Sequence, residues 1–344
     1  MTPAQERPGP GRRATIRDVA EAAGVSQSTA SRALTGRGYA AEPVRRRVQD
    51  AAERLGYVPD AMARHLKQRV SRSVGVLVHD LRNSFYADLA AGAGQAARDR
   101  GYTLTLTDLG RGQTEEVAAA EAFVAMRVAG VIATPVSGAV VDYLDRHGVP
   151  VVEVDRQFAP AVCDAVVVDN HGGARAATDH LLDLGHRRIA LLIDETDWTT
   201  GRERHRGFCT ALEARGLSVA DDLVVATGWD VTAAQTATER LLAADQRPTA
   251  IFAANNLLAE GAWRAASDAG LTIPQDLSLV SFDDAPWMTM VRPEVTAVVQ
   301  DAVAVGAAAV DRLLTRLDDG SADLQTVVLP APLVVRGSTG ALRR

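Results

Sequence analysis

The stretch TIRDVAEAAGVSQSTASRAL, which runs from Thr15 to Leu34, predicts two short helices joined at Gly24. In the first helix, apolar residues recur from Ile16 onward at i, i+3, i+4 and i+7, the spacing of one helix face. Thr15 and Asp18 have the spacing of a capping box, and Gly24 can adopt the left-handed backbone that ends a helix before a tight turn. The stretch therefore predicts a helix-turn-helix.

The second helix of this motif has a polar outer face without acidic residues. Ser26 can cap it, and Ala30 and Leu34 lie on its inner side. The outward side chains all carry hydrogen-bond donors, and no Asp or Glu occurs between residues 22 and 41. Such a face is either the solvated side of an ordinary helical hairpin or the surface of a recognition helix in the DNA major groove. Its candidate DNA contacts are Ser26, Gln27, Ser28, Thr29, Ser31 and Arg32.

The charge distribution favours the DNA-binding interpretation. Residues 1–70 contain 13 Arg and Lys against 7 Asp and Glu, a net charge of +6. The whole chain carries −6, so residues 71–344 carry −12. A basic N-terminal segment is attracted to a polyanion that the acidic remainder of the chain avoids.

Length and composition predict more than one domain. With 344 residues, 47% of them hydrophobic, the chain can bury the cores of a small head and a two-lobed body. Residues 1–13 are rich in Pro, Gly and Arg, which is typical of a disordered tail and not of a secretory signal. No apolar run is long enough to span a membrane, so we expect a cytoplasmic, nucleoid-associated protein without membrane contact. Cys163 and Cys209 lack CxxC spacing, which favours free thiols.

A further helix and a short linker follow the helix-turn-helix. Apolar residues at helical spacing between residues 44 and 55 predict a helix that closes an all-α head spanning residues 14–58. Asp60 can cap one more short helix over residues 61–67. This helix belongs to a hinge and linker for which we expect the bounds 59–73.

The motif DVAEAAGVSQSTASRAL, followed by AAERLGYVPDAMARHLK, resembles the head and hinge of the lactose-repressor and galactose-repressor family of bacterial transcription regulators. The resemblance implies that Gln27, Ser28 and Arg32 read base edges, which suits the pairing of Gln with adenine and of Arg with guanine. The other polar side chains of the recognition helix are expected to contact phosphates. The hinge helix is expected to insert Leu66 into the minor groove as an apolar wedge. The implied hinge contacts are Ala63, Arg64, Leu66 and Lys67.

The remaining residues, 74–344, are expected to form the effector-binding and dimerisation body. VGVLV at 74–78 begins an alternation of short apolar runs with helical stretches, and the same alternation restarts with IALLI at 189–193. Such alternation is typical of parallel sheets covered on both faces, so two successive sets predict an α/β body with two lobes. The resemblance implies a periplasmic-binding-protein-like fold whose chain crosses three times between the lobes. We place the crossings near 168–171, 298–301 and 329–332, so that one lobe comprises about 74–169 and 300–329 and the other about 170–299 and 330–344.

Polar and aromatic side chains follow the apolar runs of the body. Ligands of parallel α/β sheets bind at the carboxyl ends of the strands, where these side chains would meet. Aromatic faces together with Asp, Asn and Arg suit a polyhydroxylated ring. The resemblance selects ten effector contacts, which are Phe85, Tyr86, Asp155, Trp198, Thr200, Arg204, Trp229, Asn255, Asp283 and Gln300.

The sequence leaves the identity of the effector open. A sugar or sugar derivative fits these residues, and a purine or nucleoside could stack on the same aromatic rings. Asn256 stands where the family commonly has Asp, which removes an anion and slightly favours an acidic or phosphorylated effector. No residue decides whether the effector induces or corepresses.

Other classes of protein fit the sequence less well. Nothing indicates a catalytic residue, a cofactor or a metal site, because the Gly-rich stretch GAGQ at 92–95 falls within a predicted helix and the histidines lack ligand spacing. A stand-alone sugar-binding protein would need a signal peptide and would lack the basic head. The sequence therefore predicts a transcription regulator, most simply a repressor, that is controlled by a small molecule. It is expected to bind a pseudo-palindromic double-stranded operator as a homodimer, or as a tetramer built from it.

Overall fold

The computed structural model describes residues 14–35, 39–57, 71–110, 115–158, 160–194 and 196–342. The chain divides into two compact units, Met1–Ser71 and Arg72–Arg344, which we call the head and the body. The expected tail, 1–13, and the expected hinge helix, 61–67, lie outside the described residues.

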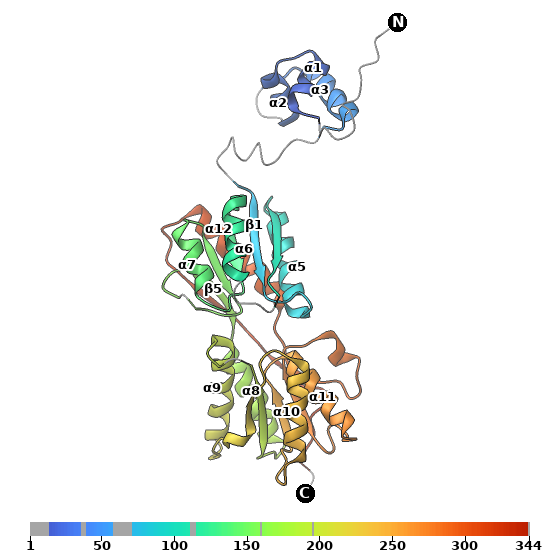
Figure 1. The fold of residues 1–344 in the computed structure, drawn as a ribbon, viewed down its shortest axis with the longest axis vertical. Helices are drawn as coiled ribbons and strands as arrows, with labels where there is room; N and C mark the ends of the chain where they lie inside the picture. Colours follow the sequence, from blue (N-terminus) through green and yellow to red (C-terminus); the bar gives the residue numbers. More distant parts are fainter. Residues whose placement is uncertain are drawn as a thin grey trace. The chain divides into compact units, whose positions relative to one another are not determined.

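The head contains the helices α1 (Ile16–Ala23), α2 (Gln27–Thr35) and α3 (Glu42–Leu55), drawn in blue in Figure 1. The capping box forms as its spacing predicts, since the side chains of Thr15 and Asp18 each accept a hydrogen bond from the other's backbone. Gly24 has φ 66° and donates its backbone N–H to carbonyls of the last turn, which ends α1. Small apolar residues from all three helices pack together as the core of the head.

The first lobe of the body is built around a six-stranded sheet of order β11-β5-β4-β3-β1-β2, in which every pair of strands is parallel. The apolar runs of the sequence become its buried central strands, as the alternation predicts. The strands are β1 (Ser73–Val78), β2 (Thr103–Asp108), β3 (Gly130–Ala133), β4 (Val151–Val154), β5 (Asp164–Val168) and β11 (Thr326–Leu329). The helices are α5 (Ser84–Asp99), α6 (Glu115–Met126), α7 (Ala139–Arg146) and α12 (Ala302–Asp318).

The second lobe repeats this plan with a sheet of order β12-β10-β9-β8-β6-β7, in which only the short edge strand β12 runs antiparallel. The strands are β6 (Ile189–Ile193), β7 (Val224–Ala226), β8 (Ala250–Ala253), β9 (Ser278–Phe282), β10 (Thr296–Val298) and β12 (Leu333–Val334). The helices are α8 (Asn170–Asp183), α9 (Thr199–Glu213), α10 (Val231–Ala243) and α11 (Asn256–Asp268). Across the described ranges of the chain, no helix has both the length and the apolar character needed to cross a membrane.

The chain passes between the two lobes three times. It leaves the first lobe after β5, returns after β10 to form α12 and β11, and leaves again to form β12. The helix α12, red in Figure 1, therefore packs against α5 of the first lobe although the two are far apart in the sequence. The predicted fold class, a small all-α head with a two-lobed α/β body, is confirmed.

The contact between α5 and α12 explains the Gly-rich stretch GAGQ. A Cβ atom on Gly92 would lie 2.2 Å from the carbonyl oxygen of Val303, and one on Gly306 would lie 2.1 Å from that of Leu89. Only glycine at these positions lets the two helix backbones approach so closely. The stretch therefore serves helix packing in the first lobe.

Candidate functional site

The recognition helix α2 presents a polar face to solvent. Gln27, Ser28, Ser31 and Arg32 are exposed, whereas Ala30 is buried against the rest of the head. The helix carries no carboxylate. Its outer face can therefore approach DNA phosphates without like-charge repulsion.

Hydroxyl groups are linked at the start of α2. Ser26 Oγ accepts a hydrogen bond from the backbone N–H of Thr29 at 3.2 Å and lies 2.9 Å from Ser28 Oγ. Arg32 Nε donates to the Ser28 carbonyl at 3.2 Å, which aligns the guanidinium along the helix. Ser26 therefore caps α2, as its position predicts. The expected hinge contacts, Ala63, Arg64, Leu66 and Lys67, lie outside the described residues.

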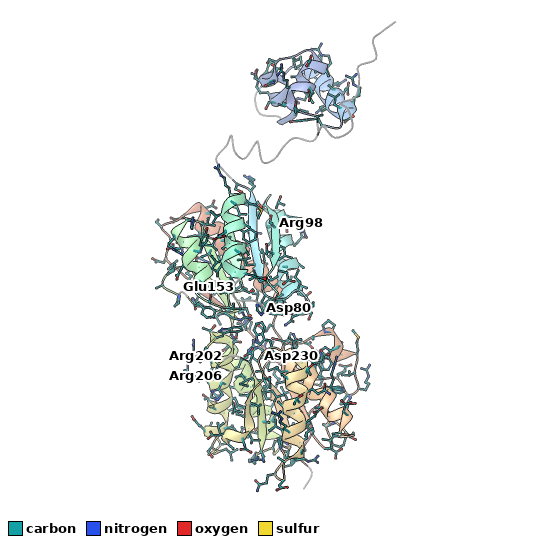
Figure 2. The ribbon with its side chains drawn as sticks, viewed as in Figure 1. Asp80, Arg98, Glu153, Arg202, Arg206 and Asp230 are labelled. Carbon is teal, nitrogen blue, oxygen red and sulfur yellow. The ribbon has the colours of Figure 1, made fainter. Side chains whose placement is uncertain are left out.

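In the body, the carboxyl ends of the strands of the two lobes face each other. Figure 2 shows Asp80 and Glu153 at the end of the first lobe that is nearest the second, and Arg202 and Asp230 at the facing end of the second lobe. The side chains that follow the strands of both lobes therefore meet in one region, which we call the cleft.

Hydrogen bonds between described residues join the lobes directly at the cleft. The side-chain amide of Asn256 donates to Asn83 Oδ1 at 2.9 Å, and the backbone N–H of Gln157 donates to Thr199 Oγ1 at 3.0 Å. Asn83 and Gln157 belong to the first lobe, and their partners begin α11 and α9 of the second. Asn256 is thus a lobe-to-lobe contact.

Arg156 lies between the lobes, although it was not among the expected effector contacts. It follows β4 of the first lobe and is 0% exposed. Its Cζ lies 4.2 Å and 4.0 Å from the ring centroids of Trp198 and Trp229 of the second lobe. The two indole rings stand edge to face, with centroids 5.0 Å apart. Cation–π attraction of one guanidinium to both rings therefore connects the two lobes.

Tyr86 and Asp155 hold Arg156 from the side of the first lobe. Arg156 Nη2 donates to the Tyr86 hydroxyl at 2.6 Å, which in turn donates to Asp155 Oδ2 at 3.2 Å. Arg156 Nε lies 3.5 Å from the same Asp155 oxygen. Asp155 has φ 69°, as does Asp283, and both residues directly follow a buried strand. A left-handed backbone at a non-glycine residue is common where a site dictates the direction of a side chain.

Asp194, the residue after β6, links two of the expected effector contacts. Trp229 Nε1 donates to Asp194 Oδ2 at 2.7 Å, and Asn255 Nδ2 donates to the same oxygen at 3.4 Å. The side-chain oxygen of Asn255 accepts from the backbone N–H groups of Leu257 and Leu258 and so caps α11. Trp229 and Asn255 are thus oriented by a carboxylate that the sequence-based selection did not include.

Phe85, Asp283 and Gln300 line a small cavity at the cleft, with a volume of about 30 Å³. Gln300 Nε2 donates to Asp283 Oδ1, and the Phe85 ring packs edge to face on Tyr86 with centroids 5.2 Å apart. The cavity holds about one water molecule, whereas pockets for small ligands enclose about 300–1,000 Å³. This cavity by itself is therefore too small for a ring-sized molecule.

Thr200 and Arg204 lie one turn apart on α9 and are both buried. Arg204 Nε donates to Asn170 Oδ1 at 2.8 Å, and Nη1 donates to the carbonyl of Ala254 at 2.5 Å. Its Cζ lies 3.8 Å from the ring centroid of Phe282. The Thr200 hydroxyl has no hydrogen-bond partner among the residues that the structure describes. Thr200 is therefore buried in the cleft, but its hydroxyl forms no hydrogen bond with another expected effector contact.

Burial changes the ionisation of the cleft carboxylates. Desolvation raises the pKa of both Asp194 and Asp283, and the nearby Arg204 guanidinium opposes the rise in both cases. The negative charges of Asp155 and Asp194 raise the pKa of Asp283 further. Like charges held together away from water are typical of functional sites.

Comparison with known proteins identifies both parts of the chain. Residues 15–60 match the family described as bacterial regulatory proteins, lacI family, and residues 178–339 match the periplasmic binding protein-like domain. Catabolite control protein A of Priestia megaterium is 34% identical over 331 residues, which cover 94% of this chain and 99% of that protein. The chain belongs to the lacI family.

Further comparisons agree with this assignment. The ribose operon repressor of Escherichia coli K12 is 30% identical over 330 residues, covering 94% of this chain and 99% of that protein. A solved structure of the lac repressor dimer, bound to operator and the anti-inducer ONPF, is similar with a TM-score of 0.86 at 28% identity, covering 96% of this chain and 100% of that one. This lacI-family protein is a sequence-specific DNA-binding transcription regulator.

The cleft of this regulator contains three residues that the selection by family resemblance missed. They are Arg156, Asp194 and Asn170, and each lies within two residues after a buried strand. The rule that ligands bind at strand ends would have found all three. Within the described ranges, no three His, Cys, Asp or Glu side chains are grouped as ligands of a metal ion.

Proposed function

We propose that this regulator is a repressor whose affinity for a pseudo-palindromic operator is controlled by a small, hydroxyl-rich effector bound in the cleft. The main support for this proposal is that one chain combines an exposed, acid-free recognition helix with a buried cleft of charged and aromatic side chains. A sugar or sugar derivative suits such a cleft, because aromatic faces cover apolar ring surfaces and carboxylates bind adjacent hydroxyls. Relatives named as a ribose operon repressor and as the lac repressor support the same class of effector.

We assign operator recognition to two groups of side chains on α2. Gln27, Ser28 and Arg32 are exposed and read base edges, with about 1–3 kcal/mol of discrimination for each bidentate contact. The hydroxyl groups position the head on the backbone. The phosphate contacts in this assignment are Ser26, Thr29 and Ser31. Gln27→Ala should therefore change the order in which operator sequences are preferred in a binding selection. An unchanged order would mean that residues other than Gln27 read the bases.

The active unit in this proposal is a homodimer in the cytoplasm, whose two heads occupy successive major-groove half-sites. The hinge, residues 59–73, places Leu66 in the minor groove between the half-sites, flanked by Ala63, Arg64 and Lys67. Leu66→Ala should lose most specific affinity while keeping nonspecific DNA binding, and equal loss of both would remove the wedge assignment. Light scattering of the purified chain tests the oligomer, and a monomeric mass with operator DNA bound would contradict it.

Effector binding controls the operator by changing how the lobes contact each other. The cleft is filled by side chains of the chain itself, above all Arg156, so a ring-sized effector binds only as these contacts rearrange. A coupling free energy of about 1–3 kcal/mol between effector binding and operator binding would change the operator affinity by about 5–150-fold. The effector contacts in this proposal are Phe85, Tyr86, Asp155, Trp198, Thr200, Arg204, Trp229, Asn255, Asp283 and Gln300.

Operator binding with and without candidate effectors tests the proposal. An operator is selected from random DNA, and the fluorescence anisotropy of a labelled fragment is then followed while sugars, sugar phosphates and nucleosides are added. We expect at least one sugar to change the affinity. Arg204→Ala should bind the operator normally without responding to that sugar, whereas Arg202→Ala, an exposed position on the same helix, should respond like the wild type. An Arg204→Ala variant that responds normally would remove Arg204 from the site.

A further inference from the structure

One carboxylate of the cleft has an unused hydrogen-bonding atom. The Asp194 side chain is 3% exposed, and its Oδ2 accepts hydrogen bonds from Trp229 and Asn255. Its Oδ1 has no partner in the described part of the chain. The large majority of buried side-chain polar atoms in proteins are hydrogen-bonded to protein or water, so a buried acceptor without a partner indicates a donor from outside the chain.

Two further buried oxygens of the cleft share this property. Thr200 Oγ1 and Gln300 Oε1 have no hydrogen-bond partner among the described residues either. Over the described ranges, these two and Asp194 Oδ1 are the buried side-chain oxygens without a partner, and all three belong to residues of the cleft. Unsatisfied acceptors gathered in one place suit a ligand that carries several donors.

The guanidinium groups of the cleft have partners within the chain, although Arg156 Nε makes no hydrogen bond among the described residues and lies 3.5 Å from Asp155 Oδ2. Arg156 donates to the Pro135 carbonyl at 3.1 Å and to the Tyr86 hydroxyl, and two indole rings cover it. Arg204 donates to two oxygen acceptors. Asp194 forms no ion pair within 4.0 Å among the described residues, and the charges of Arg204 and Arg156 act on it only from farther away. Three unpartnered oxygens outnumber the unpartnered Arg156 Nε, so the free groups of the cleft favour a ligand rich in donors.

We infer that Asp194 contacts the effector and determines its class: the free carboxylate oxygen accepts a hydrogen bond from a hydroxyl or ammonium group and rejects a phosphate or carboxylate at that position. The inference rests on the proposed control by a small molecule bound in the cleft. It reverses the preference for an acidic or phosphorylated effector that the sequence suggests through Asn256. The physical reason is that like charges repel strongly where water is excluded.

Asp194→Asn tests the inference with little change in shape. The asparagine oxygen can still accept from Trp229 Nε1, but an NH₂ group then replaces the free acceptor. We titrate the full-length protein with D-ribose, D-galactose and D-glucosamine and with a phosphate ester of each, using isothermal titration calorimetry. The wild type should bind at least one unphosphorylated sugar more tightly than its ester, and Asp194→Asn should bind that sugar about 10- to 100-fold more weakly. Asp197→Asn, the same change at an exposed position of the same connection, should bind like the wild type.

The melting temperature without sugar separates an effector contact from a structural role. Since desolvation disfavours the charged form of Asp194, as its raised pKa shows, a neutral isostere should leave the melting temperature unchanged or raise it. A purely structural Asp194 would instead lower the melting temperature and leave sugar affinity unchanged.

The titrations also distinguish failure of this inference from failure of the proposed function. The inference is overturned if a phosphate ester binds more tightly than its parent sugar, or if Asp194→Asn binds the sugar as tightly as the wild type does. Either result leaves the proposed control by a small molecule intact. Absence of binding by all three sugars and their esters counts against the proposed sugar effector itself, and this inference falls with it.

Discussion

Replacing Arg156 by alanine is expected to destabilise the body and to weaken the contact between its lobes. The substitution removes the guanidinium that packs on the rings of Trp198 and Trp229, and it leaves the Asp155 carboxylate buried without its cation. Breaking a buried ion pair costs about 3–5 kcal/mol. Cation–π attraction and hydrogen bonds of the same guanidinium are not added to this figure, because contributions within one contacting group are not additive.

Thermal unfolding followed by circular dichroism measures the loss of stability. In a domain of this size, 1 kcal/mol shifts the melting temperature by about 2–4 °C, so we expect a fall on the order of 10 °C. Tryptophan emission reports the contact between the lobes. Trp198 and Trp229 should become more exposed to water, and their emission should shift to longer wavelength. The emission of Trp263 and Trp287, whose ring centroids lie 6.1 Å apart, should not change.

Three variants control for other causes. Arg202→Ala removes an exposed arginine of α9 and should leave the melting temperature almost unchanged. Arg156→Lys keeps the charge without the planar group and should give an intermediate loss. Asp155→Asn combined with Arg156→Met removes both charges of this ion pair and should recover part of the stability. If Arg156→Ala melts within about 2 °C of the wild type with unchanged emission, Arg156 does not connect the lobes and the reasoning fails.

Substitutions in three other regions have equally definite expectations. Thr15→Ala removes the capping box of α1 and should lower the stability of the head by about 1 kcal/mol in urea unfolding, and an unchanged midpoint would show that the box contributes nothing. Gly92→Ala would place a methyl group 2.2 Å from the Val303 carbonyl and should cost about 1–3 kcal/mol in thermal unfolding of the body, whereas a wild-type melting temperature would mean that α5 and α12 are not so close. Burial lowers the pKa of His186 below 6.5, so the fold favours the neutral imidazole. The stability that this preference provides is present above pH 6.5 and is lost as the pH falls below that value. The melting temperature of the wild type should therefore fall as the pH is lowered, and that of His186→Gln should fall less. If the melting temperatures of the two proteins depend equally on pH, His186 is not the cause.

Much of the fold could be predicted from the sequence because its signals are local. The capping box of Thr15 and Asp18 and the left-handed Gly24 act over a few residues, and the structure shows both as expected. The apolar runs of the body form buried strands for a similar reason, since a short apolar segment between helices can satisfy both its side chains and its backbone only inside a sheet. These signals need no knowledge of distant residues.

The cleft could be predicted only in part. The strand-end rule and the family resemblance located ten candidate residues, but neither indicated how the side chains pair. The selection by family resemblance left out Arg156 and Asp194, although both stand at strand ends. Their contacts with residues far along the chain could be seen only in the structure. Asn256 was interpreted as a missing charge, whereas its side chain hydrogen-bonds to Asn83 of the other lobe.

The sequence by itself determined a basic, acid-free helix-turn-helix head and an acidic α/β body, because charge, capping and hydrophobic periodicity are properties of neighbouring residues. Only the tertiary structure decided that Arg156 of one lobe packs on two tryptophans of the other and that Asp194 has a buried oxygen without a partner among the described residues. Such contacts depend on how two separately formed sheets are placed against each other, and no local pattern in the chain encodes that distance.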